Sequence, residues 1–150
     1  MNPAQRIPAL GDAGLLIGRL ALGAIFIAHG WQKFDDVGHA AVTKNFEAMD
    51  IPLASLSAYF ATWVELVGGI ALILGVLVPV AGALLAFNMA GAFWFAHSDN
   101  GLWLDKGGYE YVLALGATAL LLALIGGGRF SVDALVWGRR ETPERSTVAA

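Results

Sequence analysis

The chain has 150 residues, of which 57% are hydrophobic and only 14% charged, with a formal net charge of −3 and a mean hydropathy of +0.65. Soluble domains average about a quarter charged residues, so this composition argues against a soluble globular domain, and the small acidic charge argues against a nucleic-acid partner. The absence of cysteine excludes disulfides, thiolate nucleophiles and cysteine-held metal sites within the chain, so any redox chemistry needs a bound cofactor or a partner protein.

Four apolar stretches have about the length that a helix needs to cross a bilayer. They run near 13–29, 57–78, 80–97 and 109–125. The second and third meet at Val78-Pro79, where a proline is tolerated at a helix start. The first is not expected to be a cleaved signal, because Arg19 interrupts its apolar core. The sequence therefore predicts an all-α integral membrane protein, a four-transmembrane-helix bundle over residues 1–137.

Two polar segments complete the predicted layout. Within the connection between the first two spans, apolar residues recur at helical spacing over 40–49, which predicts a short amphipathic helix at the membrane interface. Residues 138–150 are charged and then small and polar, which predicts a disordered tail. Arginines gather on the side that both termini share, so we expect the N- and C-termini in the cytoplasm.

Seven polar side chains stand inside the apolar spans or at their ends. They are Arg19, His29, Lys33, Glu65, Asn88, His97 and Glu110. A charge at the middle of a bilayer costs at least about 2.5 kcal/mol, so such groups are expected to face the bundle interior and to find partners. The sequence therefore predicts a polar pocket between the helices, open to the non-cytoplasmic side.

Within this pocket we predict an ion pair between Arg19 and Glu65, close to Asn88. Arg19 and Glu65 enter from opposite membrane faces, and their backbones are expected to differ by roughly 9 Å in height. Arg19, Phe26 and Lys33 are spaced by seven residues, which places them on one stripe of the first helix.

Each of these residues also has a purely structural interpretation. Arg19 and Glu65 could form an ion pair that only fixes helix register. Lys33 and Glu110 could extend to lipid headgroups, and Asn88 could join two helices. His29 and His97 are interpreted as interfacial hydrogen-bonding residues in preference to haem or metal ligands, because no companion ligands stand at metal spacing; no metal site is expected.

Four motifs follow one another along the chain. They are Arg19-Leu20-Ala21-Leu22-Gly23 with Phe26, His29-Gly30 and Lys33; Glu65-Leu66-Val67-Gly68-Gly69 with Leu72 and Gly75; Gly107-Gly108-Tyr109-Glu110-Tyr111; and Gly126-Gly127-Gly128-Arg129-Phe130-Ser131-Val132-Asp133. In this order and spacing the motifs resemble the DoxX family of small bacterial membrane proteins, and the resemblance covers residues 14–137. It implies a four-helix protein of the bacterial inner membrane linked to redox metabolism, since members include a subunit of a thiosulfate:quinone oxidoreductase.

These observations lead to one main hypothesis and two alternatives. The main hypothesis is a membrane subunit of a redox system that binds a quinone or a small sulfur oxyanion in the pocket. Glu65, Arg19 and His29 are the predicted catalytic residues, and Arg19, Lys33, Asn88, His97 and Glu110 the predicted binding residues. If the chain is enzymatic, it is expected to be a quinone-linked oxidoreductase subunit that needs partner redox proteins or a second copy of itself. The alternatives are a non-catalytic membrane anchor for soluble redox enzymes and a small transporter.

Overall fold

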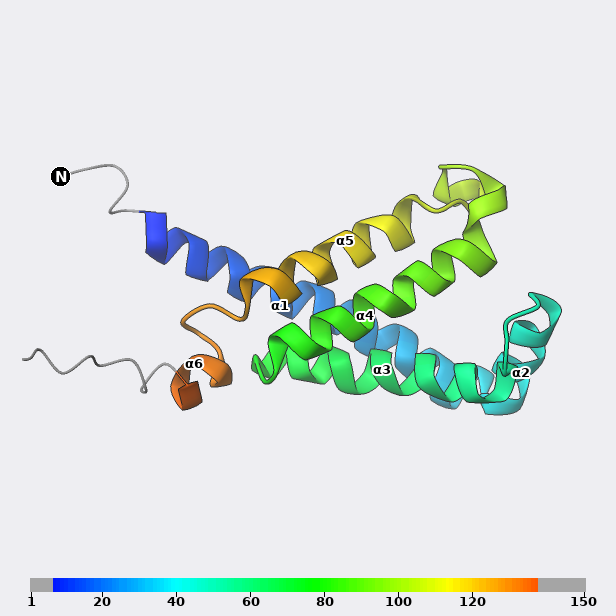
Figure 1. Ribbon diagram of the computed structural model, residues 1–150, viewed down its shortest axis with the longest axis horizontal. Helices are drawn as coiled ribbons and strands as arrows, with labels where there is room; N and C mark the ends of the chain where they lie inside the picture. Colours follow the sequence, from blue (N-terminus) through cyan, green and yellow to red (C-terminus); the bar gives the residue numbers. More distant parts are fainter. Residues whose placement is uncertain (1–6, 138–150) are drawn as a thin grey trace, which may run out of the picture.

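The computed structural model describes residues 7–137, and these residues form helices joined by short connections (Figure 1). In chain order the elements are α1 Ile7–Trp31, η2 Gln32–Val37, α2 His39–Ala48, α3 Ala54–Leu74, α4 Val78–Ala92, η3 Phe93–His97, η4 Ser98–Asn100, η5 Leu104–Lys106, α5 Glu110–Ile125 and α6 Val132–Trp137. The described part of the chain contains no strand, so the all-α prediction is confirmed there. The predicted tail at 138–150 lies outside the described residues.

Three helical stretches are long and apolar enough to cross a membrane. They are Leu10–Val37, Ala54–Leu74 and Val78–Asn100, which correspond to the first three predicted spans. The first and third extend beyond both predicted ends, whereas the second begins and ends a few residues before the predicted positions. The fourth predicted span is α5, an apolar helix of 16 residues that rises about 24 Å, so its crossing stays a prediction. The helix predicted at 40–49 is present as α2.

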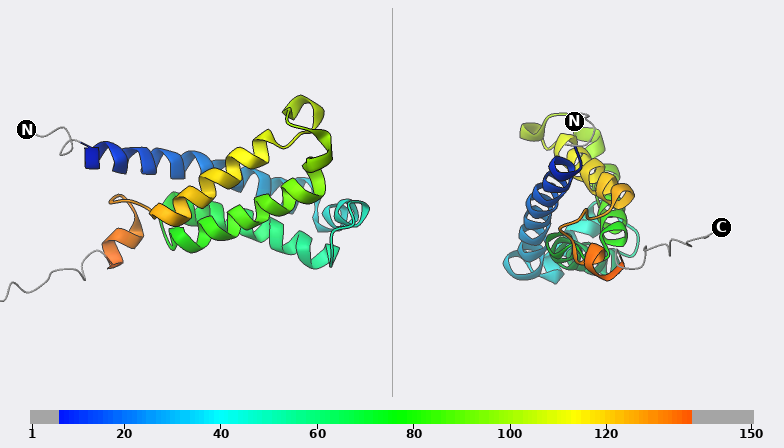
Figure 2. Two further views of the ribbon diagram at one scale, coloured as in Figure 1. Left: turned by 45° about the horizontal axis from the view of Figure 1, so that its top comes forward. Right: turned by 90° about the vertical axis from the view of Figure 1, so that its left-hand side faces the viewer.

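The helices form two pairs, α1 with α3 and α4 with α5, which are joined where α3 turns into α4. Figure 1 shows α3 and α4 leaving this turn together and separating along their length, and the first view of Figure 2 shows the same separation. We call the end with this turn and the start of α1 the termini end. The opposite end, which carries η2, α2 and the segment from η3 to η5, is called the loop end.

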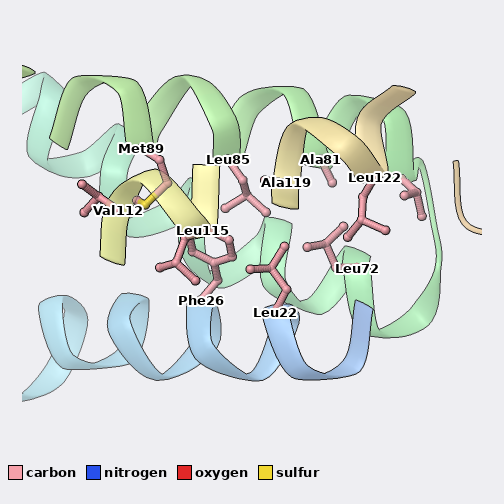
Figure 3. Close-up of a cluster of buried hydrophobic side chains, with 11 residues drawn as sticks. Leu22, Phe26, Leu72, Ala81, Leu85, Met89, Val112, Leu115, Ala119 and Leu122 are labelled. Atoms are coloured by element: carbon pink, nitrogen blue, oxygen red, sulfur yellow. The ribbon is translucent and has the colours of Figure 1, made fainter. Parts of the chain in front are cut away.

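The apolar core lies where the two pairs meet. Figure 3 shows side chains from all four long helices pointing into the same space. They include Leu22 and Phe26 from α1, Leu72 from α3, Leu85 and Met89 from α4, and Leu115 and Leu122 from α5. Phe26, Leu72 and Leu85 are fully buried, so the core closes the bundle between the termini end and its middle.

Glycines let α1 and α3 approach closely. A Cβ atom on Gly23 would lie 2.7 Å from the carbonyl oxygen of Gly69, and a Cβ atom on Gly69 would lie 2.8 Å from that of Gly23. Small residues at such contacts are the usual way in which membrane helices come into backbone contact.

The termini end is closed by two charged side chains that bind backbone groups. Arg19 is fully buried, and its Nη1 and Nη2 atoms donate to the carbonyl oxygens of Leu72, at 3.1 Å, and Phe130, at 2.7 Å. Asp133 accepts hydrogen bonds from the amides of Leu77, at 2.7 Å, and Val78, at 2.9 Å, at the start of α4. Helix ends carry backbone groups without helical partners, and these two side chains satisfy several of them.

Candidate functional site

Glu65 stands at the centre of the polar groups inside the bundle. Its side chain is 4% exposed and lies near the middle of α3, about 14 Å from the end of that helix. The Oε2 atom is 2.5 Å from Nζ of Lys33, and the Oε1 atom accepts a hydrogen bond of 2.9 Å from the side-chain amide of Asn88. One carboxylate therefore joins α3 to the extension of α1 and to α4.

The direction of helical side chains explains why Lys33 and Glu65 meet. In an α-helix the Cα–Cβ bond tilts toward the N-terminus, so a side chain covers the turn before its own residue. Lys33 lies in η2, a π-helical continuation of α1 at the loop end, and from there its side chain turns back toward the middle of the bundle. Glu65 is on an antiparallel helix and turns toward the loop end. The two charges therefore converge.

A cavity of about 580 Å³ lies beside this ion pair, between the two helix pairs; we call it the central cavity. Its walls are mainly apolar and include five phenylalanines: Phe26, Phe46, Phe60, Phe87 and Phe95. Its polar lining comprises His29, Lys33, Ser57, Glu65, Asn88, His97 and Tyr111. Five of the residues predicted to face a polar pocket therefore line this cavity, whose walls are mainly apolar. Apolar walls with a small number of polar groups are the usual make-up of a small-molecule site.

Two histidines line the central cavity, and each has a defined partner. The Nε2 atom of His29 is 3.2 Å from the hydroxyl of Tyr111, and the two rings meet edge to face at 5.9 Å. The Nδ1 atom of His97 is 2.7 Å from the carbonyl oxygen of Gly107. Because a carbonyl only accepts, Nδ1 of His97 carries the proton, and in the neutral ring Nε2 is left as an acceptor.

The predicted ion pair between Arg19 and Glu65 is wrong. Arg19 binds carbonyl groups at the termini end, and Leu72, which receives one of these bonds, is seven residues or about 10 Å along α3 from Glu65. Within the described part of the chain the ion pairs are Lys33–Glu65 and Asp12–Arg129, so Arg19 has none. The reason is again side-chain direction, because Arg19 on α1 turns toward the N-terminus and away from the bundle centre.

Glu110 is also placed away from the central cavity. Its Oε1 atom accepts a hydrogen bond of 2.7 Å from the amide of Leu104, which holds the loop before α5. The predicted stripe of Arg19, Phe26 and Lys33 is confirmed as an inward-facing surface, because the first two residues are fully buried and Lys33 is partly buried. Of the seven predicted site residues, the structure brings together His29, Lys33, Glu65, Asn88 and His97.

Sequence reasoning did not single out two residues with clear structural roles. Tyr111 lines the central cavity and contacts His29, and Asp133 binds the start of α4. Both stand within the motifs that resemble the DoxX family, and that position was the available signal. Among residues 7–137, no three histidine, aspartate or glutamate side chains gather as a metal site would require.

Comparison with known protein sequences identifies a family and several relatives. The sequence model of the DoxX family matches residues 14–98, which include Lys33, Glu65 and Asn88. The chain is 31% identical over 128 residues to the Inner membrane protein YqjF of Escherichia coli (strain K12), covering 85% of this chain and 95% of that protein. It is 29% identical over 126 residues to a Bacillus subtilis (strain 168) protein named "Putative oxidoreductase CatD", covering 84% and 89%.

A third relative is the Uncharacterized membrane protein Rv3486 of Mycobacterium tuberculosis (strain ATCC 25618 / H37Rv). It is 32% identical over 141 residues, covering 83% of this chain and 82% of that protein. No solved structure matches the chain significantly. The family match extends over more than half of the sequence, and relatives at 31% and 32% identity cover most of it. The chain therefore belongs to the DoxX family of membrane proteins.

Proposed function

We propose that this protein is the membrane subunit of a redox system and that its central cavity binds the ring of a quinone. The observation that carries the proposal is a buried carboxylate, Glu65, that lines an aromatic cavity near the middle of a membrane-spanning helix. Buried ionisable groups inside membrane spans are costly, and they commonly mark proton pathways or ligand sites. The name of the Bacillus subtilis relative is consistent with a redox role.

The lining of the central cavity suits a planar ring that carries oxygen atoms. The fully buried Phe26 supplies apolar and aromatic surface, against which a quinone ring can pack. Lys33, Asn88 and the His29–Tyr111 pair supply polar hydrogens for ring oxygens. The same few polar groups in an apolar wall would fix the orientation of such a ligand.

The charges favour a quinone over the sulfur oxyanion, the other predicted ligand. An anion inside a membrane protein needs positive charge that is not already neutralised. Lys33 is paired with Glu65 at 2.5 Å, and Arg19, the other cation expected there, binds carbonyl groups at the termini end. A neutral ring needs no such excess charge.

Quinone reduction takes up electrons together with protons. We propose that this protein supplies the protons and that a partner supplies the electrons. Glu65 would hold and release a proton beside the ligand, while Lys33 supplies the countercharge for its carboxylate form. His29 and His97 lie nearer the loop end and line the same cavity, so they can continue a proton path from that end. A partner redox protein would supply the electrons.

The proposal also includes the membrane arrangement expected from the sequence. In it α5 is the fourth span, and the termini lie in the cytoplasm. The central cavity then belongs to the outer half of the membrane, since it extends from Glu65 toward the loop end. Cysteine scanning with a membrane-impermeant thiol reagent on intact cells tests this orientation, because the natural chain contains no cysteine.

Binding of a short-tailed quinone to the purified protein in lipid nanodiscs tests the proposed function. We expect binding to the natural protein, and binding at least about tenfold weaker for Glu65→Gln, which keeps the shape of the side chain but loses its charge and proton exchange. The matched control is Glu47→Gln, the same change at an exposed position on α2. Equal affinity for the natural protein and Glu65→Gln would remove Glu65 from the site, and no quinone binding by any variant would overturn the proposal.

A further inference from the structure

We propose that the ligand of the central cavity is a lipid with a long apolar tail. While the ligand is bound, its tail passes sideways out of the protein into the bilayer between Phe60 and Phe87. This inference rests on the proposed quinone site and adds the class of quinone and its route. It concerns the wall of the central cavity formed by α3 and α4, the two helices that separate toward the loop end (Figure 1).

Phe60 and Phe87, like Phe95 nearer the loop end, line the central cavity and also face outward. Phe60 is 36% exposed and Phe87 is 70% exposed. Their rings meet edge to face with centroids 5.9 Å apart, Phe60 from α3 and Phe87 from α4. Both residues lie within stretches long and apolar enough to cross a membrane, so their exposed faces lie against lipid tails. Two phenyl rings therefore separate the cavity from the hydrocarbon at this point.

The walls of the central cavity beside α1 and α5 and toward α2 are lined mainly by buried or partly buried side chains. Between α1 and α5 the wall is built from Phe26, Val112 and Leu115, all of which are buried in the apolar core. At the loop end the cavity is covered by Phe46 and Met49 of α2 and its C-terminal flank. The exposed aromatic side chains of the lining are Phe60, Phe87 and Phe95. Of these, Phe60 and Phe87 meet each other across the line between α3 and α4.

This position determines the kind of ligand that fits. Glu65 and Asn88 lie directly inside this wall, at the junction of the same two helices. A ring bound near them would have its apolar tail next to the two phenyl rings, and the tail could remain in the bilayer at no desolvation cost. Phenyl rings can turn aside on rotamer changes without altering the helices. A ring without a tail leaves nothing in the passage between Phe60 and Phe87 once it is bound.

A reversible cross-link across the two rings tests this inference. The double variant Phe60→Cys/Phe87→Cys carries the chain's only thiols, and a short, reducible bifunctional thiol reagent would join α3 to α4 across the passage. The control pair, Val67→Cys/Val80→Cys, moves each residue by seven toward the α3–α4 turn, on the same helix faces and outside the central cavity. Equilibrium affinities are measured in nanodiscs for a quinone with a long isoprenoid tail and for the same ring without a tail.

Each affinity is compared with that of the same double variant before cross-linking. We expect the cross-link at residues 60 and 87 to weaken binding of the long-tailed quinone at least about tenfold, while the tail-less ring keeps its affinity within about twofold. Reduction of the link should restore the long-tailed affinity, and the link at residues 67 and 80 should change neither. If the linked protein binds the long-tailed quinone as tightly as the unlinked protein, the lateral passage is wrong although the quinone site stands. If neither quinone binds even the natural protein, the proposed function itself fails, and this inference fails with it.

Discussion

The Nζ atom of Lys33 and the Oε2 atom of Glu65 lie 2.5 Å apart, close to half way along α3. Glu65 is almost wholly buried, whereas Lys33 retains some exposure toward the central cavity. Asn88 binds the second carboxylate oxygen, so both oxygens of Glu65 have partners. The ion pair joins the continuation of α1 to α3, and the bond from Asn88 joins this helix pair to α4. Lys33, Glu65 and Asn88 all line the cavity that we propose as the ligand site.

Breaking this ion pair on one side should destabilise the protein more than removing both charges. We expect Lys33→Met to lower the free energy of unfolding by about 3 kcal/mol, because it leaves the Glu65 carboxylate buried without a countercharge. The double variant Lys33→Met/Glu65→Gln should recover a large part of this loss. The measurement is unfolding in mixed detergent micelles, analysed as a double-mutant cycle.

The exposed pair Lys44 and Glu47 on α2 provides the control for that cycle. Both residues are exposed, so Lys44→Met and Glu47→Gln should each change stability by less than about 0.5 kcal/mol, with no coupling between them. Purely additive effects at Lys33 and Glu65 would show that the two groups do not form the pair described here.

Removing Arg19 should destabilise the fold and leave ligand affinity unchanged. Arg19→Met leaves the carbonyl oxygens of Leu72 and Phe130 without their donor, which we expect to cost about 2 kcal/mol or more. Because Arg19 does not line the central cavity, quinone affinity of the folded variant should stay within about twofold. Arg129→Met, at an exposed position, is the control. A variant that keeps full stability but loses binding would place Arg19 in the site instead.

Two glycines on α1 should respond in opposite ways to the same substitution. A Cβ atom on Gly23 would press against Gly69 of α3, so Gly23→Ala should destabilise the protein by about 1–3 kcal/mol. A Cβ atom on Gly18 would meet nothing within 4 Å, so Gly18→Ala should be neutral or stabilising by up to about 1 kcal/mol through helix propensity. Thermal unfolding in detergent distinguishes the two, and equal effects would contradict the close contact of α1 with α3.

Asp133 should protect the beginning of α4. Asp133→Ala removes the acceptor for the amides of Leu77 and Val78, which we expect to cost about 1 kcal/mol. Hydrogen exchange of these two amides should become faster, while amides in the middle of α4 keep their rates. Asp36→Ala, at an exposed position at the loop end, is the control. Unchanged exchange at Leu77 and Val78 would show that Asp133 is not their partner.

Much of the fold was predictable because membrane helices leave a strong pattern in the sequence. Apolar length identified three helices that are long enough to cross a membrane, and the spacing of Arg19, Phe26 and Lys33 identified the inward surface of α1 and its continuation. The cost of burying Glu65 in lipid was enough to predict that it faces the bundle interior. The length of α5 was less informative, since its 16 helical residues are fewer than the predicted span contains.

The pairing of charges was harder to predict than their burial. Helical periodicity places a residue on a face but gives no direction along the helix axis. Arg19 on α1 and Lys33 on its continuation η2 lie on the same helix face. The side chain of Arg19 nevertheless extends toward the termini end, whereas that of Lys33 reaches Glu65. The π-helical continuation that carries Lys33 has no clear signal in the sequence. Tyr111 was missed for a similar reason, because a tyrosine near a span end is ordinarily an interfacial anchor.

Photoaffinity labelling with a long-tailed azidoquinone in native membranes tests the central cavity as the ligand site most directly. We predict that the labelled residues, located by mass spectrometry, will be those lining the cavity around Glu65, above all Phe60, Phe87 and Tyr111. An excess of unmodified quinone should prevent this labelling. Labelling confined to lipid-facing residues outside the cavity, such as Ile17 and Leu124, and unaffected by competing quinone, would contradict a quinone site beside Lys33 and Glu65.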